Sequence, residues 1–342
     1  MKFLPILTAT AILAATACGQ PGTKNATKNA TKDATKDAAN AGTNTTATAN
    51  ATVTGLDLSK PLPEGIPDVA IGLSTPLQHK TPEEWAQKHV ALGLKSVVFP
   101  VDCNAPEETI QAYKAAADKA GFTIAEVGIW RNTLASDPAE REKWITYAVD
   151  QLRLADRIGA VCAVNVVGTP YGPRWDGGYR DNFSQELWSE AVKMIQQVID
   201  TAKPQHAKFC IEPMPWMIPS GPDEYLRLVE DVDRPAFGIH MDIVNMINNP
   251  QRYFYNTEFI DECFAKLGDR ICSCHLKDIL LKQEFTFQLQ ECACGEGTLD
   301  IDRYLRLAAA SHPGMPMIIE HLHTDEEYLN TLKFVQATYL TK

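Results

Sequence analysis

From residue 68 onward the chain alternates short apolar runs with longer stretches of helical periodicity. Each apolar run has the length of a strand and is bounded by turn-forming residues. The first four runs cover 69–73, 96–101, 123–129 and 161–167, and four more end at residues 212, 242, 275 and 320. Eight strands that alternate with helices predict an α/β fold, the (β/α)8 TIM barrel, in which all strands are parallel.

The stretches between the runs carry signals for helix ends. The segment 81–84 (Thr-Pro-Glu-Glu) is a capping box with proline at the first helical position, and Gly93 ends this helix. The periodicity predicts further helices at 107–120, after Asp137, at 184–202 and at 325–339. The segment 168–183 is rich in Gly, Arg, Trp and Asp, and we predict a long loop there that covers the site as a substrate lid.

The last four runs each end in an acidic or imidazole side chain. These residues are Glu212, Asp242, His275 and Glu320. A carboxylate at one strand end is commonly a helix cap or an ion-pair partner. Four such acidic or imidazole residues at the ends of successive strands favour a metal site, because parallel barrel strands point their C-terminal ends at one face. Three carboxylates and one imidazole predict one divalent metal ion, with Mn²⁺ as the first choice and Mg²⁺, Co²⁺ or Zn²⁺ as alternatives.

The same residues suit the removal of a proton next to a carbonyl group. A bound metal ion polarises the carbonyl of a sugar. One carboxylate can then remove the neighbouring proton, and a second carboxylate on the opposite face can return it. Glu212 and Glu320 come from strands on different sides of the cavity, as this chemistry requires.

Side chains alternate along a strand, so each strand-end residue predicts the orientation of its neighbours. The lumen should also receive Cys210, His240, Ser273 and Lys277, whereas His321 should point towards the helices. We interpret His240 either as a hydrogen-bonded residue below the site or as a substrate contact. Lys277 is either a solvated charge at the rim or a substrate contact.

Three tryptophans are candidate sugar-stacking groups. Trp130, Trp175 and Trp216 follow strands or lie in loops on the same face. Their aromatic rings either stack on a substrate or pack within those loops.

The charge of the chain argues against a nucleic-acid partner. The formal net charge is −11, and the first 60 residues carry six Lys and three Asp. The remainder therefore carries a net charge of −14. Such an acidic domain repels a phosphate backbone.

The N-terminus has the pattern of an export signal. Lys2 precedes a short apolar stretch, and small residues lead to Cys18. The pattern resembles the bacterial lipoprotein box, with 1–18 as signal peptide and Cys18 as the acylated residue; simple cleavage is the alternative. Residues 19–60 contain a fourfold Thr-Lys-Asn/Asp-Ala repeat and predict a disordered linker that the fold does not need. Residues 61–342 then form the barrel, which a lipid anchor holds at the membrane on the periplasmic side of a bacterial cell envelope.

The cysteines are interpreted mainly as small apolar residues. Cys162, Cys210, Cys272 and Cys274 lie within predicted strands. Cys292 and Cys294 are placed in a loop. No Cys-x-x-Cys pair is present, which disfavours a cysteine metal site.

Five short blocks resemble the xylose isomerase-like TIM barrels, a superfamily that includes ketose 3-epimerases, inosose dehydratases and apurinic-site endonucleases. The blocks are Ile211-Glu212-Pro213, Met241-Asp242, Cys274-His275-Leu276-Lys277-Asp278, Gly295-Glu296-Gly297 and Ile319-Glu320. The resemblance covers roughly 68–340. It implies that the four strand-end residues bind the metal and that Glu212 and Glu320 are the acid–base pair.

The chain departs from the ketose 3-epimerase pattern at two places. Asn245 stands where these enzymes have a histidine, three residues after the metal aspartate. Lys277 and Asp278 stand where they tend to have an arginine. Asn245 therefore joins His240, Lys277 and the three tryptophans as a predicted substrate-binding residue.

The chemistry leaves three functions open. The first is a metal-dependent isomerase or epimerase that acts on an unphosphorylated sugar, since phosphorylated sugars are mainly cytoplasmic. The second is a lyase or dehydratase that acts on a keto-sugar or a 3-keto-glycoside by the same proton abstraction. The third belongs to another class, a sugar-binding lipoprotein without catalysis. A homo-oligomer is compatible with each.

Overall fold

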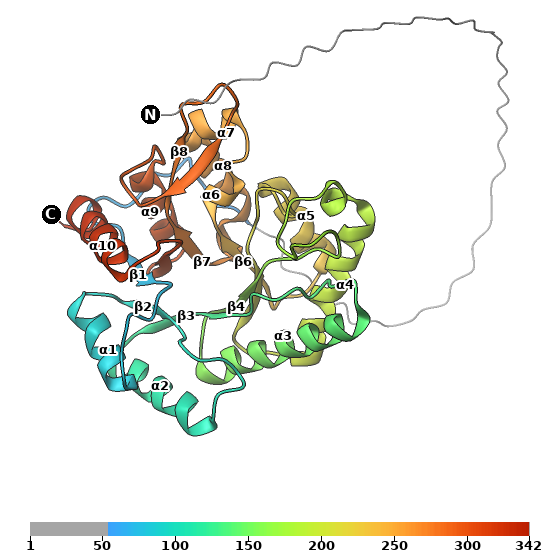
Figure 1. The fold of residues 1–342 in the computed structure, drawn as a ribbon. Coiled ribbons are helices and arrows are strands. Elements are labelled where there is room, and N and C mark those ends of the chain that lie inside the picture. Colours follow the sequence, from blue (N-terminus) through green and yellow to red (C-terminus); the bar gives the residue numbers. More distant parts are fainter. Residues whose placement is uncertain (1–53, 342) are drawn as a thin grey trace, which may run out of the picture. The chain divides into compact units, whose positions relative to one another are not determined.

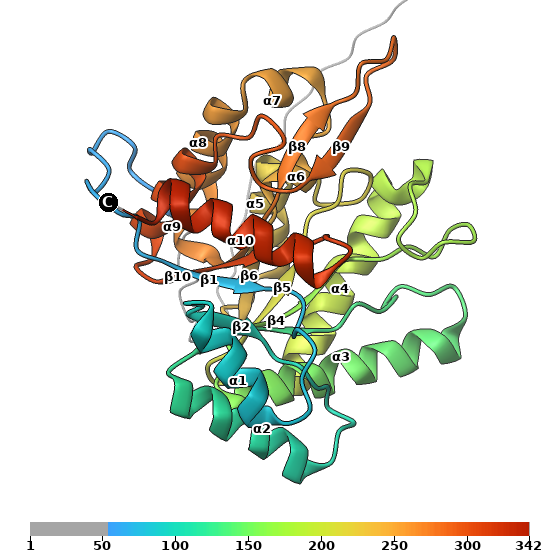
Figure 2. The same ribbon diagram turned by 60° about the vertical axis from the view of Figure 1, so that its left-hand side comes forward.

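The computed structural model describes residues 54–341. The predicted signal peptide, Cys18 and the linker up to residue 53 lie outside the described residues. Within them, the helices and strands alternate as the sequence predicts (Figures 1 and 2). None of the helices in this part of the chain combines the length and apolar character needed to cross a membrane.

Eight parallel strands form the barrel, and two more form a hairpin. The barrel strands are β1 (Val69–Leu73), β2 (Ser96–Val98), β3 (Thr123–Gly128), β4 (Cys162–Asn165), β5 (Lys208–Ile211), β6 (Phe237–Met241), β7 (Ile271–Leu276) and β10 (Met315–Ile319). The hairpin strands are β8 (Asp278–Leu281) and β9 (Leu289–Cys292).

Helices connect the strands on the outside of the barrel. The α-helices are α1 (Pro82–Ala91), α2 (Glu107–Ala120), α3 (Pro138–Ile158), α4 (Gln185–Ala202), α5 (Pro222–Val232), α6 (Ile243–Met246), α7 (Pro250–Phe254), α8 (Asn256–Leu267), α9 (Ile301–Ser311) and α10 (Asp325–Tyr339). Two short 3-10 helices, η1 (Arg180–Phe183) and η2 (Gly268–Arg270), complete the set.

The strand order is that of a nearly closed ring. Neighbours pair in the order β1-β10-β7-β6-β5-β4-β3-β2, and every pair is parallel. At the seam between β1 and β2, the backbone N–H of Lys95 donates to the carbonyl of Ile71 at 3.1 Å. The predicted (β/α)8 barrel is confirmed, so the C-terminal ends of all eight strands meet at one face.

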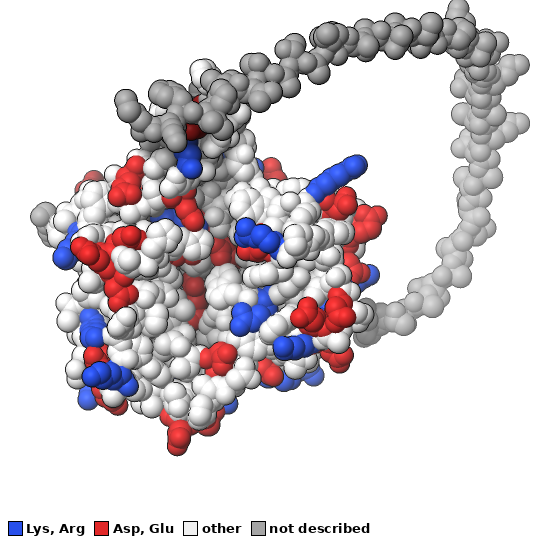
Figure 3. Space-filling model, viewed as in Figure 1, with Lys and Arg blue, Asp and Glu red and all other residues white. Residues whose placement is uncertain are grey.

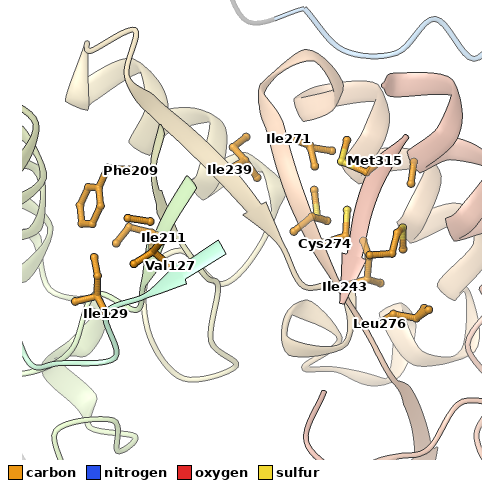
Figure 4. Close-up of a cluster of buried hydrophobic side chains, with 14 of the residues drawn as sticks. Val127, Ile129, Phe209, Ile211, Ile239, Ile243, Ile271, Cys274, Leu276 and Met315 are labelled. Carbon is orange, nitrogen blue, oxygen red and sulfur yellow. The ribbon is translucent and has the colours of Figure 1, made fainter. Parts of the chain in front are cut away.

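The core has two parts, because successive side chains on a barrel strand face opposite sides. On β5, Phe209 and Ile211 join the large apolar layer between strands and helices, which Figure 4 shows in part. Cys210 faces the other way and packs with Cys162 and Val164 in a separate cluster. The prediction that the Cys210 side chain faces the lumen of the barrel is therefore confirmed. All eight cysteines within 54–341 are free thiols.

The N-cap residues that the sequence predicts for α1 and α3 form capping hydrogen bonds in the structure. Thr81 Oγ1 accepts a hydrogen bond from the N–H of Glu84 at 3.2 Å, and Asp137 Oδ1 accepts one from Glu140 at 2.8 Å. Helix α2 ends at Gly121, whose φ of 72° is readily adopted by glycine. These local bonds satisfy backbone groups that would otherwise lack partners at the helix ends.

The structure differs from the sequence prediction after β7. The β8–β9 hairpin was not predicted, and Cys292 lies at the end of β9 rather than in a loop. Several strands are also shorter than their apolar runs; β2 spans Ser96–Val98 instead of 96–101, with a register shift after Val97. Apolar residues beyond such a strand end still enter the core, as the buried Phe99 does. Apolar runs therefore overestimate strand length.

The end of the predicted linker contacts the barrel. Thr54 Oγ1 donates to Asp269 Oδ2 at 2.7 Å, and the Asp269 N–H donates to the Thr54 carbonyl at 3.1 Å. The Leu56 N–H donates to the Phe264 carbonyl at 2.9 Å, and Leu56 and Leu58 pack against the core. Residues 54–58 thus depart from the expectation for the linker, because this part of the segment carries leucines.

Removal of residues 1–60 should therefore destabilise the protein more than removal of residues 1–53. The shorter chain loses the bonds to Asp269 and the partial burial of Leu56 and Leu58, a loss of about 1–3 kcal/mol. Urea unfolding of the two proteins measures the difference. Leu56→Ala in the longer protein is the matched control and should give part of the loss. Equal unfolding midpoints would show that residues 54–60 add nothing to the fold.

Candidate metal centre

The structure brings together the four strand-end residues. Glu212, Asp242 and Glu320 directly follow β5, β6 and β10, and His275 lies near the end of β7. One ligand atom from each lies within 4.8 Å of those of the others, and all four side chains are buried. In Figure 3, acidic side chains are visible at the floor of a hollow near the middle of the face shown.

The three carboxylates face the same ring nitrogen. His275 Nδ1 lies 2.9 Å from Glu320 Oε2, 3.2 Å from Glu212 Oε1 and 3.8 Å from Asp242 Oδ2. That nitrogen can carry only one proton, which cannot satisfy three carboxylates at once. Burial lowers the pKa of His275, but the charges of Glu320 and Glu212 outweigh burial and raise it well above its usual value.

Lys277 supplies the nearest positive charge. Its ammonium lies 2.6 Å from Glu320 Oε1, 2.8 Å from Asp242 Oδ2 and 3.2 Å from Glu291 Oε2. The side chain is 2% exposed, so the alternative of a solvated rim charge is wrong. One ammonium does not neutralise this group of carboxylates. The donor set therefore fits a divalent metal ion, which could be held by Glu212, Asp242, His275 and Glu320.

The two predicted acid–base residues differ in their affinity for protons. Burial raises the pKa of Glu212 to about 7, against the opposing effect of His275. Burial also acts on Glu320, but His275 and Lys277 outweigh it and lower the pKa of that carboxyl. Among the protein groups alone, the two carboxyl groups thus have unequal pKa values.

A second layer of polar residues lies beneath the four. His240 Nδ1 lies 2.7 Å from Ser273 Oγ and 3.5 Å from Glu126 Oε1, while Glu126 Oε2 lies 3.5 Å from His275 Nε2. His240 is fully buried, and burial and nearby His275 lower its pKa to about 4. Of its two interpretations, the structure favours the residue below the site.

Glu126 was missed by the sequence analysis. It lies within β3 rather than at a strand end, 1% exposed, and forms a second compact group with His240 and His275. The signal was present, since an acidic residue occurs inside an otherwise apolar run. Its partners come from β6 and β7, across the barrel, and no local pattern reveals them.

Glu126→Gln should weaken metal binding by about 10- to 100-fold, because an outer carboxylate fixes the orientation and tautomer of a ligating histidine. Glu126 faces the His275 nitrogen remote from the three carboxylates, and so favours a free Nδ1. Titration with Mn²⁺ followed by electron paramagnetic resonance measures the affinity. Glu108→Gln, exposed on α2, is the control and should bind like the unchanged protein. Unchanged affinity in Glu126→Gln would limit that residue to core packing.

Two predicted substrate-binding residues lie directly against the site. Asn245 Nδ2 donates to Glu212 Oε1 at 2.9 Å, and the Asn245 N–H donates to Asp242 Oδ1. The Trp130 ring lies 6.4 Å from that of His275 and is tilted by 31°. Gly128 permits this position, because a Cβ there would lie 2.2 Å from Trp130 Nε1.

The other two tryptophans have different positions. Trp216 Nε1 donates to the carbonyl of Asp176 at 2.7 Å, and Asn182 Nδ2 donates to the carbonyl of Trp216. These bonds join the predicted lid, 168–183, to the loop after β5. Trp216 lines a cavity at the site, whereas Trp175 is half-buried in the lid and is not among the residues that line this cavity.

The cavity has a volume of about 560 Å³. It is bounded by the loop after β5, by α6 and the two residues that follow it, by the β8–β9 hairpin and by His321. The prediction that His321 points to the helices is wrong: its backbone is left-handed, with φ of 57°, and its Nδ1 lies 2.7 Å from Glu291 Oε2. Strand alternation no longer applies there, because β10 ends at Ile319.

Asp278, the last residue of the sequence block around His275, has a structural role. Its carboxylate accepts hydrogen bonds from four backbone N–H groups, those of Ile279, Gly295, Gly297 and Leu299. A Cβ at Gly297 would lie 2.3 Å from Asp278 Oδ1, so the close approach requires glycine. Asp278 therefore shapes the base of the hairpin and the glycine-bounded loop, while Lys277 faces the carboxylates.

The chain belongs to the xylose isomerase-like TIM barrel family, whose model matches residues 87–338. The structure is similar to D-psicose 3-epimerase from Clostridium cellulolyticum H10, solved with D-tagatose (TM-score 0.60, 14% identity, 79% of this chain and 99% of that one). It is also similar to a xylose isomerase-like TIM barrel protein from Mycobacterium smegmatis in complex with magnesium (TM-score 0.58, 16% identity, 79% of this chain and 95% of that one). A third similar structure is 3-keto-D-glucoside 4-epimerase from E. coli (TM-score 0.55, 14% identity, 79% of this chain and 99% of that one). A comparison with curated protein sequences finds no significant match.

Proposed function

We propose that this protein is a metal-dependent isomerase or epimerase that removes a proton next to the carbonyl of an unphosphorylated sugar. The observation that carries the proposal is the position of Glu212 and Glu320, 3.2 and 2.9 Å from His275 Nδ1, beside an open cavity. Similarity to proteins named as sugar epimerases supports it.

Each residue has a defined task in this proposal. Glu212, Asp242, His275 and Glu320 hold the ion, Mn²⁺ in the first place. When bound, a divalent ion supplies Lewis-acid polarisation of a carbonyl oxygen. Glu212 and Glu320 remove and return the proton, and Asn245 orients Glu212 through its amide. Trp130 lies beside His275, where its ring could contact the substrate.

A second candidate is a lyase that acts on a keto-sugar or 3-keto-glycoside. The observation that favours it is Lys277, whose ammonium lies 2.6 Å from Glu320 Oε1 and can stabilise the negative charge on a departing oxygen. The proton abstraction is the same in both reactions. They differ in whether the second proton goes to carbon or to the leaving oxygen.

We also propose the setting that the N-terminus predicts. The protein would be exported to the bacterial cell envelope and anchored through a lipid on Cys18. Its substrate would then be a sugar or glycoside outside the cytoplasm. Mass spectrometry of the membrane-extracted protein tests this, since acylation of Cys18 adds a diagnostic mass to the mature N-terminus.

Nuclear magnetic resonance in D₂O tests the reaction. The metal-loaded protein is mixed with free sugars and with keto-glycosides, and deuterium at one carbon identifies the abstracted proton. Epimerisation gives a labelled epimer, whereas a lyase releases the aglycone. Binding of these compounds without exchange or turnover would overturn the proposal and favour a sugar-binding protein.

A further inference from the structure

We propose that the cavity beside the four-residue site binds an apolar group of the substrate, so that the substrate is a sugar bearing an aryl or alkyl substituent rather than a bare monosaccharide. This rests on the proposed function for the placement of the sugar at the carboxylates. The substituent would lie against the β8–β9 hairpin and the loops after β5 and β6.

The lining of the cavity is mostly apolar away from the carboxylates. Its apolar members are Met214, Pro215, Trp216, Val244, Ile247, Ile279, Phe287 and Leu289. Two are aromatic and strongly exposed, Trp216 at 41% and Phe287 at 40%. Contact with an apolar group would remove these surfaces from water, which favours binding.

Three polar residues of the cavity lining contact the site. Asn245 donates to Glu212, Glu291 lies 3.2 Å from Lys277, and His321 Nε2 lies 3.4 Å from Glu320 Oε2. The cavity therefore adjoins the four-residue site through these three lining residues. A sugar held by the carboxylates would find partners for its hydroxyls at this end.

The outer part of the cavity offers few partners for further hydroxyls. The Trp216 N–H is occupied by the Asp176 carbonyl, and Asn248 Nδ2 donates to the Ser220 carbonyl at 3.2 Å. Gln290 is exposed on β9. Hydroxyl groups placed there would lose water without gaining enough hydrogen bonds, which is unfavourable.

The volume agrees with a ligand larger than one sugar ring. Cavities of about 300–1,000 Å³ suit drug-sized ligands, and this one has about 560 Å³. Since Asn245, Glu291 and His321 are the lining residues that contact the site, the apolar residues of the lining are left to receive the substituent. An amphipathic keto-glycoside has the matching distribution of polar and apolar surface and also supplies the carbonyl that the proposed function needs.

Matched pairs of glycosides test the inference. The methyl and phenyl 3-keto forms of β-D-glucoside, xyloside and galactoside are titrated into the metal-loaded protein, because an unoxidised glycoside has no carbonyl group. Affinities are measured by calorimetry or saturation-transfer resonance. The phenyl member of the recognised pair should bind about 10- to 100-fold more tightly, as expected for burial of an aromatic ring. Equal affinity within the pairs, or no binding of any phenyl member, overturns the inference.

Variants of the hairpin locate the contact. Phe287→Ala and Leu289→Ala should each reduce the ratio of phenyl to methyl affinity by about threefold or more, because both side chains line the cavity. Phe285→Ala is the matched control, since Phe285 is fully exposed on the same hairpin and does not line the cavity; the ratio should persist. An unchanged ratio in both cavity variants would also contradict the proposal.

The outcome separates this inference from the proposed function. Turnover of free sugars without a phenyl preference leaves the isomerase intact and removes the apolar subsite. A phenyl preference without deuterium exchange in any sugar keeps the subsite and removes the isomerase.

Discussion

Asp242→Asn and Asp242→Ala are both expected to lose stoichiometric metal. Asp242 contributes one of the four converging donors, and its Oδ1 also caps α6 by accepting from the Asn245 N–H. The Asn variant can keep this cap, whereas the Ala variant loses it at an additional cost of about 1 kcal/mol. Elemental analysis after gel filtration measures the bound metal. Asp118→Ala, exposed on α2, is the control and should retain it.

The same variants should lose the stabilisation that metal gives. Binding to the native state alone adds about 2.7 kcal/mol at a metal concentration roughly 100 times Kd. Thermal unfolding with Mn²⁺ and with a chelator measures this increment in each protein. The unchanged protein should show it and both Asp242 variants should not. Full metal content and a full increment in both would exclude Asp242 as a ligand.

Glu212→Gln and Glu320→Gln should each reduce turnover by about 10²- to 10⁴-fold, the usual contribution of a positioned acid or base. Glutamine keeps the shape and one oxygen donor, but it cannot accept the proton. Turnover should therefore fall more than substrate affinity does. Steady-state kinetics with the substrate found by the D₂O experiment give both quantities, and metal content is measured in parallel.

Exchange with solvent separates the roles of the two carboxylates. The variant of the base should stop incorporation of deuterium into the substrate. The variant of the acid alone should still exchange while failing to form product. Near-normal exchange and turnover in both variants, with metal retained, would restrict Glu212 and Glu320 to holding the ion.

The barrel and the convergence of the four residues could be predicted because they rest on two short-range rules. Parallel strands place their ends at one face, and alternation along each strand decides which side chains face the lumen. His275 obeys these rules within β7, and Glu212, Asp242 and Glu320 each stand one residue past their strands at the same face. Relations across the barrel, or further beyond a strand end, do not follow from them. Glu126 meets His275 only through strand order, and His321 turns into the cavity through a left-handed residue.

The position of Lys277 and the presence of the hairpin could not be predicted from the sequence, because both depend on contacts between residues far apart in the chain. The sequence left Lys277 open between solvent and site, and its burial between Asp242 and Glu320 follows from the closure of β7 against β6 and β10. The hairpin has short strands, and its pairing depends on the anchored base at Asp278. Neither has a signal within a few residues along the chain.

The anchoring of the β8–β9 hairpin by Asp278 has a consequence for how this scaffold can diversify. Its base is fixed by four backbone hydrogen bonds, whereas residues 282–288 are exposed. Changes in the length or composition of this tip should leave the four strand-end residues in place while they alter one wall of the cavity. We therefore expect the hairpin to be an interchangeable segment, and libraries confined to residues 282–290 test whether ligand preference changes while the four-residue site stays the same.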